Sequence, residues 1–132
     1  MPTRRTTRGA ERTPLGGEFD VLICGASFAG LSVARELTGS GARVLVIDRY
    51  EIGERQTSAC GIPTEWLRAM GLMGSHRQTF RRLVVHTPFG TSVLELPWTF
   101  STFDYPALCE LLWDQCDASF ETAKVNGRSG NV

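Results

Sequence analysis

The sequence predicts an α/β fold with a parallel, doubly wound sheet, on the basis of three observations. Phe19–Cys24 and Arg43–Asp48 are short and almost wholly apolar, as strands buried on both faces of a parallel sheet are. A glycine-rich turn and a helical segment stand between them. Strand, helix and strand in about 30 residues form a βαβ unit, whose right-handed crossover makes the two strands parallel.

The segments between and after these strands continue the pattern. A helix is expected over Leu31–Leu37, between the turn Gly25–Gly30 and Gly41, which ends it. A polar loop then leads to a short helix over Pro63–Met70. Proline is favoured in the first turn of a helix and glycine just after its end, so Gly71 is expected to close this helix.

A hairpin and a third helix are predicted next. Leu83–His86 and Thr91–Leu96 have the composition of strands and flank the turn Pro88–Gly90. Asp104 is the expected N-cap of a helix that runs to about Cys116, because the apolar residues after it recur at helical spacing. The hairpin interrupts the alternation of strands and helices, so we expect a β-hairpin insertion in the α/β fold.

The two ends of the chain differ from its middle. Phe120–Val125 predicts a strand, and Asn126-Gly127 is typical of a type I′ hairpin turn. Few residues follow that turn, so we expect a truncated chain that holds only part of its sheet. Residues 1–17 are rich in Arg, Thr, Pro and Gly. They are expected to form a disordered Arg-rich tail before an ordered domain over 18–132.

Composition excludes several classes of protein. Fourteen Lys and Arg balance fourteen Asp and Glu, so no basic field favours nucleic acid. No apolar run reaches the roughly 20 residues that span a bilayer. The four cysteines contain no Cys-x-x-Cys pair, which predicts neither a metal site nor a disulfide scaffold. Reduced thiols favour the cytoplasm, and Cys24, inside the first strand, is expected in the core.

The turn Gly25–Gly30 has the position and spacing of a dinucleotide-binding fingerprint, between a strand and a helix. Gly25 allows the tight turn, and Gly30 lets the helix pack closely on the sheet. Ser27 stands where the second glycine of G-x-G-x-x-G is usual, and its hydroxyl can donate a hydrogen bond to a phosphate. The N-terminus of the helix presents N–H groups and a partial positive charge to a pyrophosphate.

Asp48 ends the second strand about 20 residues after the fingerprint, where a carboxylate meets ribose hydroxyls. An ionised carboxylate accepts hydrogen bonds from a 2′,3′-diol and repels a 2′-phosphate, which disfavours NADP at this site. NAD and FAD both place an ADP half in such a unit, so these residues leave the choice between them open. The alternative without a ligand is a solvated strand end beside an ordinary turn.

Several segments resemble FAD-dependent oxidoreductases related to geranylgeranyl reductases and aromatic-ring hydroxylases. In the family's order, they are Asp20–Leu31, Val44–Arg49, Ile52-Gly53, Cys60-Gly61, Phe103-Asp104 and Phe120–Val125. The resemblance covers almost all of the chain from Phe19 onward. It implies a partial doubly wound, Rossmann-like FAD-binding fold, with FAD as the cofactor.

The resemblance also implies roles for individual residues. The FAD pyrophosphate would lie on the fingerprint residues Gly25, Ala26, Ser27, Phe28, Ala29 and Gly30. Asp48 would hold the adenosine ribose. Cys60 and Gly61 match a segment on the flavin side, and Val125 matches a strand whose backbone meets the adenine. Arg49, directly after Asp48, is a further candidate for the adenine or its phosphate, with simple surface exposure as the alternative.

We therefore predict an FAD-dependent oxidoreductase, of which this chain binds the ADP half of FAD. The family implies a small-molecule substrate, with NAD(P)H as a candidate electron donor. No catalytic residue is identified in this chain, so catalysis by the chain alone is left open. Two alternatives remain, namely an NAD-dependent dehydrogenase built on the same βαβ unit and a vestigial, non-catalytic product.

Overall fold

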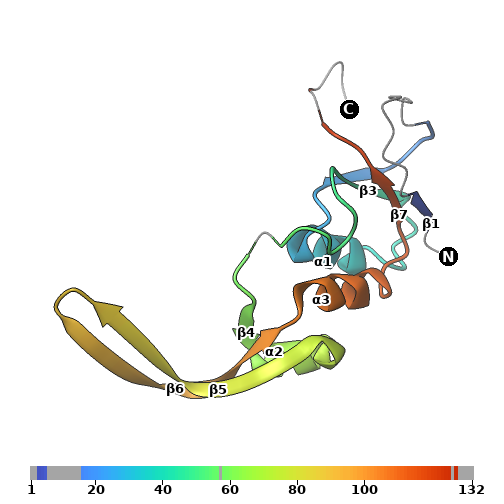
Figure 1. Ribbon diagram of the computed structural model, residues 1–132. Coiled ribbons are helices and arrows are strands. Elements are labelled where there is room, and N and C mark those ends of the chain that lie inside the picture. The colour runs from blue at the N-terminus through green and yellow to red at the C-terminus, as the bar shows by residue number, and fades with distance from the viewer. Residues whose placement is uncertain (1–2, 6–15, 57, 126, 128–132) are drawn as a thin grey trace.

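The computed structural model describes residues 3–5, 16–56, 58–125 and 127. In this part of the chain, a four-stranded parallel sheet and a three-stranded antiparallel sheet lie at opposite ends, with helices between them (Figure 1). No helix of the described residues has the length and apolar character needed to cross a membrane.

The parallel sheet confirms the predicted α/β class. Its strands are β1 (Thr3–Arg5), β2 (Val21–Cys24), β3 (Val44–Asp48) and β7 (Ser119–Thr122), in the spatial order β1-β7-β3-β2. All three strand pairs are parallel. Cys24 lies opposite Ile47, so β2 and β3 end side by side. This register places the turn after β2 next to Asp48.

Two helices lie on one face of this sheet, side by side in Figure 1: α1 (Phe28–Glu36) and α3 (Tyr105–Trp113). Their buried side chains meet those of the central strands, and the shared core includes Leu31, Ala34, Val46, Leu108, Leu112 and Phe120. The helix predicted from Leu31 begins earlier, at Phe28, because the last residues of the glycine-rich turn already form its first turn.

The start of α3 confirms the predicted cap. An oxygen of the Asp104 side chain accepts a hydrogen bond from the Ala107 N–H at 2.9 Å. Arg77 pairs with the other oxygen at 2.6 Å. The Arg77 guanidinium and the Ala107 N–H hold the pKa of Asp104 below its usual value. The beginning of α3 is therefore held by bonds from two directions.

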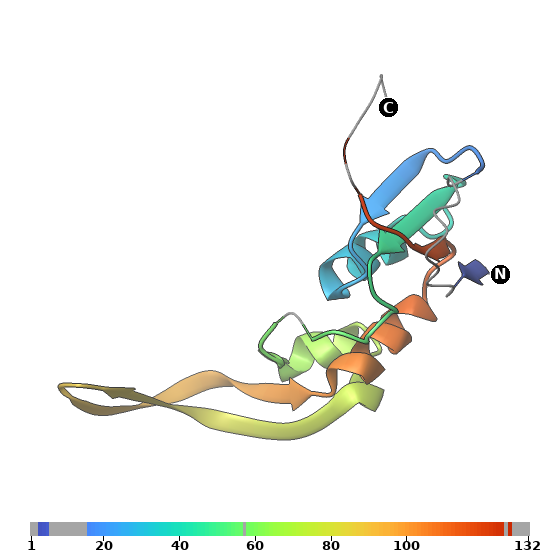
Figure 2. The same cartoon turned by 45° about the horizontal axis from the view of Figure 1, so that its top comes forward.

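The second sheet is antiparallel, in the order β4-β6-β5. It consists of β4 (Gly61–Pro63), β5 (His76–Thr87) and β6 (Gly90–Phe103), with α2 (Thr64–Ala69) and the 3-10 turn η1 (Met73–Ser75) between β4 and β5. Beyond its base, the β5–β6 hairpin extends away from the rest of the molecule as a long two-stranded ribbon (Figure 2). The predicted strands covered only its outer part next to the turn, whereas the pairing continues to His76 and Phe103 at its base.

Burial of β2 differs from the prediction. Leu22 is 47% exposed and Cys24 is exposed, so Cys24 is not a core residue. Leu22 pairs with Leu45 and Cys24 with Ile47, and successive residues of a strand point to opposite faces. Val44 and Val46 pack in the shared core, so Leu22 and Cys24 face away from α1 and α3, on a strand that pairs on one side only.

The two ends of the chain also differ from expectation. Thr3–Arg5, inside the segment predicted to be a disordered tail, form β1 and pair with β7. A sheet edge can pair with any nearby strand, which local composition does not reveal. The last strand, β7, ends at Thr122 and not at Val125. The hairpin turn predicted at Asn126-Gly127 lies partly outside the described residues.

Candidate functional site

The turn between β2 and α1 requires glycine at two positions. Gly25 has a φ of +121°, a conformation that residues with a side chain rarely adopt. A Cβ atom at Gly30 would lie 1.9 Å from the carbonyl oxygen of Gly25 and 3.2 Å from Ile23 Cγ2. Because the closest atom belongs to the backbone, no side-chain movement can relieve this contact. The two glycines let α1 start directly against the end of β2.

The N-terminus of α1 has no side-chain cap. Ser27 is the N-cap, with extended φ and ψ of −81° and 172°, yet its side chain makes no capping hydrogen bond. The first turn contains no acidic residue. The first N–H groups of a helix have no partner within the helix, and they attract anions. Here, neither the cap side chain nor an acidic residue of the first turn competes for them.

The Asp48 carboxylate faces this turn. Its Oδ2 accepts a hydrogen bond from the Ala26 N–H at 2.8 Å, and its Oδ1 accepts one from the Tyr50 N–H at 3.1 Å. A carboxylate has about four acceptor positions, so two bonds leave room for further donors. Asp48 therefore ties the end of β3 to the fingerprint and can still accept bonds from a diol.

The glycine turn and Asp48 line the same pocket, which has a volume of about 410 Å³. That volume falls in the range of small-molecule and cofactor sites. Its walls come from the turn after β2, the loop after β3 and the first residue of α3. The lining residues are Ala26, Ser27, Asp48, Arg49, Tyr50, Glu51, Gly53, Arg55, Gln56 and Tyr105.

Two guanidinium groups lie over one aromatic ring in this pocket. Arg49 is 5.5 Å and Arg55 5.0 Å from the centre of the Tyr50 ring. Arg55 also donates a hydrogen bond to the Tyr50 hydroxyl. Cations over an aromatic face are attracted by its quadrupole. Tyr50 therefore holds two positive charges in the pocket that Asp48 also lines.

The start of α3 forms another wall. Gly53 has a φ of +75°, and a Cβ atom there would lie 2.9 Å from the Pro106 Cα. The loop after β3 thus packs directly on α3. Next to it, the Tyr105 hydroxyl donates a hydrogen bond to Ser27 Oγ at 3.0 Å. Three segments that are far apart in sequence meet at this point.

The predicted site residues divide into two groups. The first group belongs to the pocket or to the turn beside it. The pocket is lined by Ala26, Ser27, Asp48 and Arg49. The turn is shaped by Gly25 and Gly30, and α1 begins with Phe28 and Ala29. Cys60, Gly61 and Val125 are not among the lining residues. Cys60 packs against the core, Gly61 opens β4, and Val125 is 55% exposed beyond β7.

The environment of Cys60 also bears on its chemistry. Burial, together with the nearby Asp104 carboxylate, raises the pKa of the Cys60 thiol. A raised pKa lowers the fraction of thiolate, which is the nucleophilic form. All four cysteines are free. These properties do not favour a redox role for Cys60.

Sequence reasoning missed several residues of the pocket. The loop after β3 contributes four of them, namely Tyr50, Glu51, Arg55 and Gln56. Their signal was their position, within eight residues after Asp48 in the sequence. Tyr105 had no such signal. It is 78 residues from Ser27 in the chain, and only the packing of α3 brings the two together.

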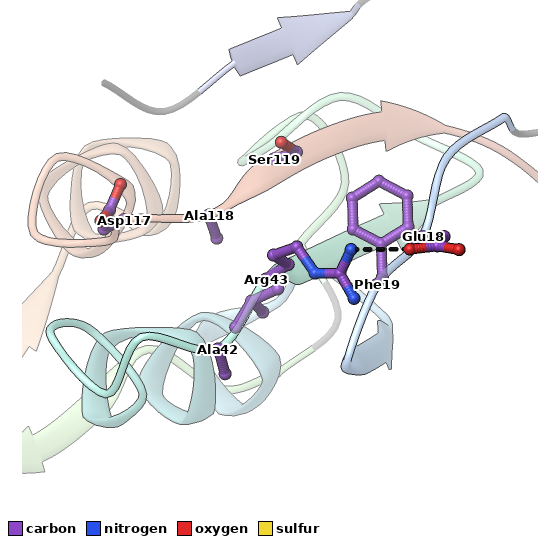
Figure 3. A pocket seen from close by; sticks show the side chains of 8 residues that line it. Glu18, Phe19, Ala42, Arg43, Asp117, Ala118 and Ser119 are labelled. Atoms are coloured by element: carbon purple, nitrogen blue, oxygen red, sulfur yellow. Dashed lines mark hydrogen bonds and ion pairs between the residues drawn. The ribbon is translucent and has the colours of Figure 1, made fainter.

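A second pocket lies near the opposite, amino-terminal ends of the parallel strands (Figure 3). Its lining includes Glu18, Arg43, Asp117 and Ser119. Arg43 pairs there with Glu18 at 3.2 Å and, through two nitrogens, with Asp20. Its guanidinium holds the pKa of Asp20 at about 2. Arg43 is thus already paired with two carboxylates, and the pocket contains none of the predicted site residues.

A βαβ unit with a glycine turn, a helix N-terminus without a side-chain cap and an acid on the second strand is typical of dinucleotide-binding α/β proteins. Comparison with known families agrees: the family described as FAD dependent oxidoreductase (DAO) matches residues 20–98. The chain belongs to this family of FAD dependent oxidoreductases, whose members depend on a flavin.

Curated relatives are similar over part of the chain. The digeranylgeranylglycerophospholipid reductase 3 of Methanosphaera stadtmanae is 36% identical over 89 residues, which are 64% of this chain and 22% of that protein. The uncharacterized oxidoreductase YurR of Bacillus subtilis is 48% identical over 46 residues, or 35% of this chain and 12% of that one. The chain thus spans less than a quarter of these relatives.

Solved structures share the fold. A geranylgeranyl bacteriochlorophyll reductase-like protein from Thermoplasma acidophilum has a TM-score of 0.66 at 17% identity, with 83% of this chain and 33% of that chain covered. PqsL of Pseudomonas aeruginosa, described as a probable FAD-dependent monooxygenase, has a TM-score of 0.57 at 20% identity, with coverages of 79% and 32%. At sequence identities of 17% and 20%, these structures show that the fold is shared.

Proposed function

We propose that this chain binds the ADP half of FAD and forms part of an FAD-dependent oxidoreductase that acts on a small molecule. The observation that carries the proposal is the Asp48 carboxylate, 2.8 Å from the Ala26 N–H of the glycine turn. This bond brings the acid for a ribose and the helix N-terminus for a diphosphate into one pocket.

The residues present fit such a ligand. The Gly25–Gly30 contact leaves no room for a side chain between strand and helix, so α1 can start directly against the end of β2, as it does in dinucleotide-binding units. The first-turn N–H groups of α1 would hold the diphosphate, and Asp48 would accept bonds from the ribose hydroxyls. Arg49 and Arg55 would add positive charge near the phosphates.

NAD would use the same βαβ unit, so the unit alone does not select the ligand. We propose FAD because the family is named for it. When bound, FAD supplies hydride or oxygen chemistry at its flavin ring. The chain's own residues bind and orient the adenine end. NAD(P)H as the electron donor belongs to this proposal, as does a cytoplasmic location, with which four free thiols agree. We also propose that Cys60 and Gly61 lie on the flavin side of the cofactor and that the backbone at Val125 meets the adenine.

A titration tests the proposal. The purified chain is mixed with FAD, with NAD or with ADP, and binding is measured by calorimetry and by the flavin absorption band at ~450 nm that stays with the protein on gel filtration. We expect FAD and ADP to bind. Binding of NAD and ADP without FAD would favour the dehydrogenase alternative, and binding of none of the three would favour the vestigial product.

A further inference from the structure

The hydroxyl of Ser27 is used in an unusual way. Serine at an N-cap normally accepts a hydrogen bond from the second or third N–H of its helix. Ser27 has the extended backbone conformation that this requires, but it makes no capping bond. Its Oγ instead accepts a hydrogen bond from the Tyr105 hydroxyl at 3.0 Å. In this arrangement, Oγ is engaged by Tyr105 and not by the N–H groups of α1.

The choice between these two bonds matters for an anion. A capping serine and a phosphate compete for the same first-turn N–H groups, because both supply an acceptor oxygen. A serine rotated onto α1 would occupy one of these donors before the ligand arrives. Glycine, which is usual at this position of the fingerprint, has no side chain that could do so.

Tyr105 is well placed to control the position of Ser27. Its side chain is only 3% exposed, and it is the first residue of α3. The helix is fixed there by the Asp104 cap and by the close contact of Pro106 with Gly53. The Tyr105 hydroxyl is therefore a donor at a fixed position beside the fingerprint.

We propose that Tyr105 is a positioning residue of the dinucleotide site, whose hydroxyl holds Ser27 away from the first-turn N–H groups of α1 and keeps these groups available to the diphosphate. This inference rests on the proposed function. It explains how a serine can stand at a fingerprint position where glycine is usual. It also gives a role to a side chain that is distant in the sequence.

The first test is the variant Tyr105→Phe, which keeps the ring and removes the hydroxyl. Loss of one hydrogen bond that orients the site should weaken ADP binding about fivefold to tenfold. Binding of adenosine, which has no phosphate, should stay unchanged. Calorimetry measures ADP affinity, and ligand-observed NMR measures adenosine affinity. An equal loss for both ligands would overturn the proposal, because it would indicate general damage to the pocket.

Ser27→Ala separates positioning from structural support. This variant removes the competing oxygen, so the effect of Tyr105→Phe on ADP affinity should disappear in its background. In the double variant Ser27→Ala/Tyr105→Phe, ADP affinity should return to the Ser27→Ala value. Failure of this rescue would overturn the proposal, as would a large loss in Ser27→Ala alone, which would make Ser27 a phosphate donor. The single serine variant decides the matter even where Tyr105→Phe does not fold.

Thr64→Val is the matched control. Thr64 is 5% exposed, and its hydroxyl bonds to Ser101 Oγ at 2.8 Å, away from the pocket. This variant also loses a buried hydroxyl bond, so it should lower thermal stability without changing ADP affinity. A wild-type chain that binds neither ADP nor FAD would refute the proposed function itself. ADP binding that is unaffected by Tyr105→Phe would refute the positioning role alone.

Discussion

At the scale of single residues, Gly30 sets the geometry of the glycine turn. We expect Gly30→Val to abolish measurable ADP and FAD binding, because its Cβ would have to lie 1.9 Å from the Gly25 carbonyl oxygen. Strain of this kind also costs about 3 kcal/mol of stability. Calorimetry and urea unfolding measure the two effects. Gly16→Val is the control, because a Cβ atom there meets nothing within 4 Å. Retained ADP binding in Gly30→Val would contradict the site assignment.

Asp48→Asn tests the acid at the end of β3. The amide has one acceptor oxygen where the carboxylate has two, so the Ala26 and Tyr50 N–H groups can no longer both be satisfied on separate oxygens. We expect a loss of about 1–3 kcal/mol in the free energy of unfolding. The preference for ADP over 2′-phospho-ADP should also narrow, because the negative charge that repels a 2′-phosphate is gone.

The measurements are urea unfolding and competition binding with the two nucleotides. Asp117→Asn is a suitable control, because Asp117 lines the pocket at the opposite end of the sheet. An unchanged nucleotide preference in Asp48→Asn would show that the ribose lies elsewhere.

At the scale of secondary structure, the cap of α3 makes stability depend on pH. Arg77 and the Ala107 N–H lower the pKa of Asp104 in the folded chain. A carboxyl with a depressed folded pKa stabilises the fold above its unfolded pKa of about 3.9, and this contribution is lost as the pH falls through the folded pKa. We expect Asp104→Ala to lower the Tm at pH 7 by a few degrees.

The difference between wild type and Asp104→Ala should shrink as the pH falls from about 4 through the lowered folded pKa of Asp104, since the wild-type carboxylate loses its charge there. Thermal unfolding of both proteins between about pH 7 and pH 2 measures this difference in Tm. Asp114→Ala, at the opposite end of α3, is the control, because its side chain lies at the C-cap and not at the N-cap. A difference that stays constant with pH would show that the charge of Asp104 does not stabilise α3.

Local sequence predicted the elements whose causes are local. The apolar run of β3, the glycine turn and the Asp104 cap each follow from residues within a few positions of one another. Features that depend on distant partners were missed. β1 exists because β7 offers an edge, and Leu22 and Cys24 are exposed because β2 pairs on one side only. In the site, Asp48 could be predicted from its spacing, whereas Tyr105 could not.

At the scale of the whole molecule, the site and the ribbon should differ in stability. The main core joins the parallel sheet to α1 and α3, whereas the outer β5–β6 hairpin extends away from it (Figure 2). The hairpin exposes apolar residues such as Leu83, Val84 and Leu94. A two-stranded ribbon is marginally stable in water by itself. Segments with few buried contacts and solvent-exposed backbone hydrogen bonds open most easily. Amide hydrogen exchange should therefore be slow in β3 and fast over residues 83–94.

Ligand binding should sharpen this contrast. ADP at 100 times its dissociation constant stabilises the state that binds it by about 2.7 kcal/mol, which slows exchange wherever opening destroys the site. We expect slower exchange in β3, α1 and the start of α3, which together build the pocket. The outer ribbon opens without disturbing Asp48 or the fingerprint, so its exchange should stay the same. Exchange followed by mass spectrometry, with and without ADP, measures both regions. Equal slowing in the ribbon would mean that hairpin and site unfold as one cooperative unit.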